Sequence, residues 1–74
     1  MADRPATWTA DRADRVVAGW FVHDQLPLLS EDAPATGWLA VDMVDADVNG
    51  VLLSLSTGVA QYWPRDRVIY MGWA

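Results

Sequence analysis

The residues of this chain that could bind a metal ion lie between Asp45 and Gly50. Asp45, Asp47 and Asn49 occur at alternate positions before a glycine, as the first three oxygen ligands of a calcium-binding loop do. Such a loop ends in a bidentate glutamate at its twelfth position, where this chain has Ser56. We therefore expect no cofactor, and calcium binding at Asp45, Asp47 and Asn49 is only a minor alternative.

The same segment fits a β-hairpin better. Asn49-Gly50 is typical of a two-residue type I′ turn, and the residues on both sides of it alternate between apolar and polar. Counting outward from this turn pairs Val48 with Val51, Ala46 with Leu53, and Val44 with Leu55. One face of the hairpin is then apolar, and the other carries Asp42, Asp45 and Asp47. This acidic face could bind a basic partner or face only water.

The strand before this turn changes parity. Leu39 and Val41 are odd-numbered, whereas Val44 and Ala46 are even-numbered, so a regular strand cannot direct all four side chains inward. A β-bulge near Asp42-Met43 resolves the conflict, because it adds one unpaired residue and bends the strand.

A second reversal follows at residues 56–58, Ser-Thr-Gly. A two-residue turn there directs Ala60 and Tyr62 toward the core, whereas a three-residue loop directs Val59 and Trp63 inward. The spacing leaves both registers open, and with them the position of Trp63.

Aromatic and arginine residues near the end of the chain are the candidate partner-binding residues. They are Trp63, Arg65, Arg67, Tyr70 and Trp73. Trp and Tyr are frequent at the energetic centre of protein interfaces, and Arg pairs well with carboxylates and phosphates. We expect two other tryptophans, Trp20 and Trp38, to lie in the core.

His23-Asp24 is the one place where a histidine adjoins an acid. Adjacent side chains on a strand point to opposite faces, so this spacing does not form a hydrogen-bonded catalytic pair. No serine or threonine lies in a nucleophile motif, and so small a domain has little room for an enclosed pocket. We expect no catalytic residues and no enzyme activity.

The composition narrows the possible partners. The chain has 74 residues, a net charge of -5, no cysteine and five cations, all of them arginine. Nucleic-acid binders usually carry a basic patch, so nucleic acid is an unlikely partner and a basic protein fits better. No apolar run is long enough for a membrane helix, and the first residues do not resemble a signal peptide. We expect a cytoplasmic protein, and the lack of lysine with abundant Ala, Asp and Val is typical of a high-GC bacterium or its phage.

The N-terminal half is harder to interpret. Residues 1–8 resemble a flexible arm, followed by one small domain over 9–74. Within 9–25, an amphipathic helix capped by Thr9 and a strand over 15–23 are equally good interpretations, as is a short turn over 9–14 before the strand. Residues 24–37 form a long connection, whose Leu26, Leu28 and Leu29 are expected to pack on the core.

The whole order is a strand, a long loop, a bent strand, a hairpin, and a short turn at Pro64-Arg65-Asp66-Arg67 before a last strand at 68–71. This layout resembles that of SH3-like small barrels, including Tudor-like and KOW-like modules. The resemblance implies a mainly β fold, an antiparallel barrel of about five strands with a short N-terminal helix or turn. The alternative is an α+β fold, with an N-terminal helix packed on a three- to four-stranded meander.

These observations favour a small protein-interaction module, either an adaptor or a protein that forms a homodimer. Two alternatives stay open. One is an acidic inhibitor or nucleic-acid mimic that binds a basic protein, and the other is a KOW- or Tudor-like nucleic-acid-binding barrel.

Overall fold

The computed structural model describes residues 2–25, 27 and 32–74, so the loop residues Leu26, Leu28 and Leu29 lie outside the described part. The described residues form seven strands: β1 (Ala2–Asp3), β2 (Thr7–Arg12), β3 (Phe21–His23), β4 (Thr36–Ala46), β5 (Gly50–Leu55), β6 (Ala60–Pro64) and β7 (Val68–Trp73). A 3-10 turn, η1 (Ala13–Arg15), follows β2. The predicted mainly β fold is confirmed.

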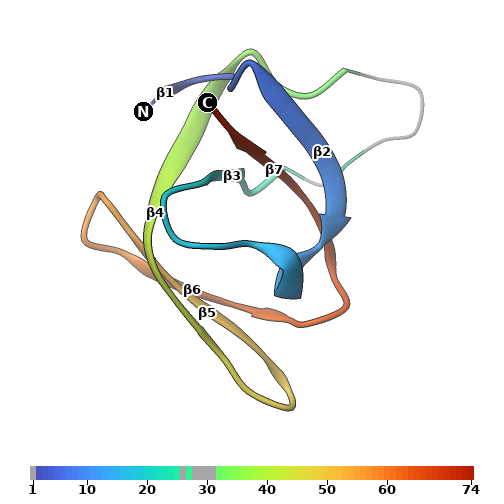
Figure 1. The fold of residues 1–74 in the computed structure, drawn as a ribbon, viewed down its shortest axis with the longest axis vertical. Coiled ribbons are helices and arrows are strands. Elements are labelled where there is room, and N and C mark those ends of the chain that lie inside the picture. Colours follow the sequence, from blue (N-terminus) through green and yellow to red (C-terminus); the bar gives the residue numbers. More distant parts are fainter. Residues whose placement is uncertain (1, 26, 28–31) are drawn as a thin grey trace.

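The strands form one antiparallel sheet in the order β2-β7-β3-β4-β5-β6, and β1 pairs with the start of β4 (Figure 1). Among the described residues, β2 and β6 do not pair with each other, so the sheet does not close into a barrel. Two backbone hydrogen bonds connect the segments that follow β2 and β6. The N–H groups of Ala13 and Asp14 in η1 donate to the carbonyls of Arg67 and Arg65.

Of the interpretations left open for residues 9–25, the amphipathic α-helix is wrong. Thr9 does not cap a helix but lies within β2, opposite Met71 of β7. The backbone then turns through η1 and reaches Gly19, whose φ of 93° is incompatible with a right-handed helix and strained for any residue with a Cβ. The segment predicted as an arm, residues 1–8, contains β1 and the start of β2.

The long strand β4 joins the two halves of the sheet (Figure 1). Its first part pairs with β3, and its second part pairs with β5. The predicted bulge is confirmed, because Val41 lies opposite Leu55 whereas Met43 lies opposite Ser54, which leaves Asp42 as the extra residue. The bulge allows Val41 and Val44 to face the same core.

The predicted register of the β4–β5 hairpin is wrong by two residues. Ala46 pairs with Val51 rather than Leu53, and the Asp47 N–H donates to the Gly50 carbonyl across a turn whose central residues are Val48 and Asn49. Neither central residue has a positive φ, so the turn is not type I′. A shift of two preserves side-chain parity, so Val51 and Leu53 still face inward, but Val48 is exposed.

The register of the β5–β6 hairpin is the three-residue alternative. The Leu55 N–H donates to the Val59 carbonyl, and the Gly58 N–H donates back to the Leu55 carbonyl. Gly58 has a φ of 87°, as the last residue of such a loop requires. Trp63 is therefore directed inward opposite Val51, although Val59 stays exposed.

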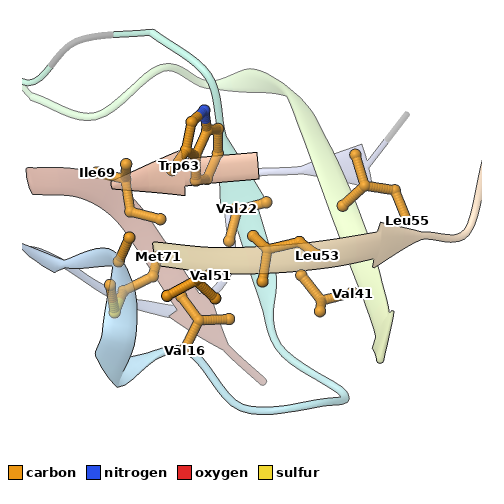
Figure 2. Packing of buried hydrophobic residues seen from close by; sticks show 10 residues of the cluster. Val16, Val22, Val41, Val51, Leu53, Leu55, Trp63, Ile69 and Met71 are labelled. Atoms are coloured by element: carbon orange, nitrogen blue, oxygen red, sulfur yellow. The ribbon is translucent and has the colours of Figure 1, made fainter. Parts of the chain in front are cut away.

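Among the described residues, two hydrophobic clusters stabilise the sheet. The larger cluster contains residues of η1 and of β3 to β7. Figure 2 shows Val22, Val41 and Leu53 converging within it. Its buried members are Ala13, Val16, Val22, Val41, Val51, Leu53, Leu55, Trp63, Ile69 and Met71. The smaller cluster is aromatic, with Trp38 and Tyr70 buried beside Ala33, and Trp8 and Phe21 packed against them.

Candidate functional site

The predicted aromatic binding residues are mostly part of the interior. Trp63 is 6% exposed and Tyr70 is 2% exposed, so both lie in the hydrophobic clusters. Trp73 stacks on Trp20 with 4.4 Å between ring centroids. An exposed patch of Trp63 and Tyr70 therefore does not exist in the folded chain.

The two predicted arginines have partners within the chain. The Arg65 Nε atom lies 3.3 Å from an Asp14 carboxylate oxygen, which also accepts from Arg12 at 2.9 Å. The Arg67 guanidinium lies over the Trp63 ring, 5.2 Å from its centroid. Arg65 thus connects the β6–β7 turn to η1, whereas Arg67 packs on β6.

A different surface, the outward face of β4, β5 and β6, carries exposed apolar side chains. Met43 is 64% exposed, Leu52 38% and Tyr62 50%. The strand register places Leu52 between Tyr62 and Asp45, and the neighbouring row consists of Met43, Ser54 and Ala60. Side chains in directly opposite positions of antiparallel strands are in contact range. We call this surface the outer hairpin face; its residues are Met43, Asp45, Leu52, Ser54, Ala60 and Tyr62.

The predicted acidic residues border this face. Asp45 ends the row that contains Leu52 and Tyr62, and Asp42 is the exposed bulge residue next to Met43. The sequence contained a signal for this surface, because Leu52 and Tyr62 are large apolar side chains at positions where the alternation requires polar ones. That signal points to an apolar patch with a negatively charged rim.

Asp47 stabilises the hairpin turn. Its Oδ1 atom accepts hydrogen bonds from the backbone N–H groups of Asn49 and Gly50, at 2.8 and 2.9 Å. These two bonds, that of Asn49 first, hold the pKa of Asp47 below its ordinary value, and the positive charge of Arg65 adds to the effect. The carboxylate proposed as the second calcium ligand is thus directed into its own turn.

The three candidate calcium ligands lie on different elements. Asp45 lies in β4, paired with Leu52, whereas Asp47 and Asn49 belong to the turn. Within residues 2–25, 27 and 32–74, no group of three His, Cys, Asp or Glu side chains is placed to hold a metal ion.

His23 fixes the base of the long connection between β3 and β4. Its Nδ1 atom accepts from the Gln25 N–H at 3.0 Å, and Nε2 lies 3.0 Å from the Thr36 carbonyl. Since Nδ1 is an acceptor, Nε2 carries the proton and donates to Thr36. The ring also meets Trp38 edge to face, with 5.8 Å between centroids. These contacts give His23 a structural role.

No protein-family model, curated protein or solved structure matches this chain. In the part of the chain that the structure describes, no helix has the length and apolar character that a membrane crossing needs.

Proposed function

We propose that this chain is a small protein-interaction module that binds its partner on the outer hairpin face. The observation that carries the proposal is the exposed group of Met43, Leu52 and Tyr62 on three neighbouring strands. Contiguous exposed apolar side chains with a polar rim are typical of protein-interaction sites. The hairpin registers hold these side chains on a rigid sheet, so a partner meets a preorganised surface.

The charge of the rim selects the class of partner. Asp45 lies in the face, and Asp42 lies beside it, whereas the nearest described cation along β6 is Arg65, which pairs with Asp14. The complementary ligand is a protein segment with an apolar side chain flanked by Arg or Lys. Such a partner contacts both an aromatic and an acidic surface, as expected from the sequence. The aromatic residue is Tyr62, however, and not Trp63 or Tyr70.

The contacts of the two arginines favour a protein over a nucleic acid. Arg65 is paired with Asp14, and Arg67 lies over Trp63, so both arginines already interact within the chain and supply less positive charge to a phosphate than free side chains would. An acidic mimic of nucleic acid would need charges along an extended face, whereas the outer hairpin face combines a few acids with apolar side chains.

The strand order supports the resemblance to SH3-like barrels. Many such barrels are protein-interaction modules. β3 pairs with the last strand β7, and β4, β5 and β6 follow as a meander, with a short turn before β7. The open edge between β2 and β6 is the departure from that pattern. A cytoplasmic setting fits a chain without cysteine.

The proposal is tested by selecting peptides from a random display library on the immobilised chain. We expect enrichment of peptides with Leu, Met or an aromatic residue next to Arg or Lys. Met43→Ser should weaken their binding about tenfold, which corresponds to about 1.4 kcal/mol. Val17→Ser, a matched change at an exposed valine outside this face, should leave the affinity unchanged.

The charge requirement has its own control. Asp45→Asn should weaken binding and reduce its dependence on salt, whereas Asp66→Asn in the β6–β7 turn should change neither. Selection of acidic peptides, or equal loss of binding in Met43→Ser and Val17→Ser, would contradict the proposed site.

A further inference from the structure

Strand β6 is an edge of the sheet whose outward backbone groups can be identified from the register. The Leu55 N–H donates to the Val59 carbonyl, and hydrogen-bonded pairs alternate along an antiparallel ladder. Residues 59, 61 and 63 therefore bond to β5, whereas the N–H and C=O groups of Ala60 and Tyr62 point away from it. Among the described residues, no strand pairs with this side of β6.

We propose that β6 pairs with β6 of a second copy of this chain in an antiparallel, twofold-symmetric arrangement centred on Gln61. In this register, Ala60 of each copy lies opposite Tyr62 of the other, and both residues donate and accept a backbone hydrogen bond. The surface is self-complementary, as a twofold interface requires.

Alternative registers satisfy fewer of these groups. Centring the pair on Ala60 or on Tyr62 joins only that residue to its symmetry mate. Neither neighbouring position completes a second two-bond pair, because Pro64 has no N–H, and Gly58 has its N–H bonded to Leu55 and leaves the extended strand at a φ of 87°. The bonding pattern therefore selects the register centred on Gln61.

A second observation concerns the Gln61 side chain. Its Oε1 atom is buried and has no hydrogen-bond partner among the described residues. A buried acceptor without a partner destabilises the folded chain, because it has lost its hydrogen bonds to water. In the proposed dimer, the two Gln61 residues are directly opposite, with about 4.5–5.5 Å between Cβ atoms. A rotation of the side chains then allows the amide NH₂ of each to donate to the Oε1 of the other.

The composition of β6 also favours a second copy. Edge strands are usually protected from such pairing by charged side chains, prolines or bulges. From Ala60 to Trp63 this strand has no charge and no proline, although the chain carries a net charge of -5. Two copies can therefore approach along β6 without bringing their carboxylates opposite each other on this strand.

The inference goes beyond the proposed function, because the pairing uses the backbone of β6 rather than the side chains that bind the partner. Its consequence is a continuous sheet in which the two outer hairpin faces lie next to each other. A partner with two basic-apolar segments would then bind two sites at once, which raises its avidity.

The decisive test is the mass of the chain in solution by sedimentation equilibrium over a concentration series. We expect twice the monomer mass of 8.2 kDa at high concentration. Ala60→Pro removes an outward N–H that β5 does not use, so this variant should fold and stay monomeric. Ala60→Val keeps the N–H and should dimerise like the original chain. A monomer at every concentration, or dimerisation of Ala60→Pro, would overturn the proposal.

A crosslink tests the register independently of these variants. The chain has no cysteine, so Gln61→Cys introduces a unique thiol at the twofold axis, where the Cα–Cα distance of about 4.5 Å suits a disulfide. Under mild oxidation this variant should form a covalent dimer. Ala60→Cys places the thiols about 8 Å apart and should stay monomeric under the same conditions.

The crosslinking result tests the register of the proposed dimer, and the mass in solution tests whether the dimer forms. Equal crosslinking of both variants, or none of Gln61→Cys, would refute the register. Peptide binding by the original chain, diluted until it is monomeric, reports separately on the proposed function, so the two hypotheses can fail independently.

Discussion

Substitution of Gly50 by alanine tests how the two hairpins pack together. A Cβ atom at Gly50 would lie 2.4 Å from Cζ and Oη of Tyr62 and 2.6 Å from the carbonyl oxygen of Trp63. Carbon atoms prefer about 3.5–4.0 Å, so the side chain of Tyr62 must move by roughly 1 Å or more. The Trp63 carbonyl is harder to displace, because it belongs to the ladder with β5.

The expected cost of Gly50→Ala is about 1–3 kcal/mol, as for other overpacked positions. In a domain of this size, each kcal/mol corresponds to about 4–8 °C in the melting temperature. Thermal unfolding followed by circular dichroism measures the shift. The clash predicts that Tyr62→Ala relieves part of the cost, so a double-mutant cycle should give a favourable coupling between the two changes.

The cycle also separates this explanation from backbone strain. If Gly50 were required for a positive φ, as in a type I′ turn, the cost of Gly50→Ala would be the same with or without the Tyr62 side chain. Equal costs in both backgrounds, or a Gly50→Ala chain as stable as the original, would refute the reasoning.

Three further predictions follow from the turn and the core. Trp63→Ala should lower the free energy of unfolding by about 3–5 kcal/mol in urea titrations, because it empties a buried site; a cost below about 1 kcal/mol would contradict its burial. Asn49→Ala should change stability by no more than about 0.5 kcal/mol, since Asn49 has no positive φ, and a larger loss would indicate the type I′ turn. Asp47 has a lowered pKa in the folded chain, so its contribution is present above the unfolded value of about 3.9 and is lost as the pH falls through the folded pKa. Asp47→Asn keeps an acceptor oxygen without titrating, so its melting temperature should approach that of the original chain as the pH falls below about 4, and a constant difference would refute the assignment.

The sequence predicted the β-rich second half well because turns and alternation act locally. The bulge at Asp42 followed from the parity of Val41 and Val44 alone, and a three-residue loop ending at Gly58 was one of two registers considered. The facing directions of Val51 and Leu53 were also correct, because a slip of two residues leaves parity unchanged.

Other features depend on contacts that local patterns do not contain. Gly50 suggested an Asn-Gly turn, but its small size is required by Tyr62, a residue of the next strand. The turn itself is set by the Asp47 carboxylate, which bonds to two backbone N–H groups. The burial of Tyr70 depends on the loop residue Ala33 and on Trp8 from the N-terminal segment, distant in sequence. The candidate site moved to Met43, Leu52 and Tyr62 for the same reason.

The most direct test of the proposed binding site is to map amide chemical shifts while a selected basic-apolar peptide is added to the ¹⁵N-labelled chain. We predict that the perturbed amides cluster at residues 43–45, 52–54 and 60–62, the strand segments that carry the outer hairpin face. Amides around the buried aromatic cluster of Trp38 and Tyr70 should change little. Perturbations confined to the β6–β7 turn at residues 65–67, with none at Leu52 or Tyr62, would contradict this account.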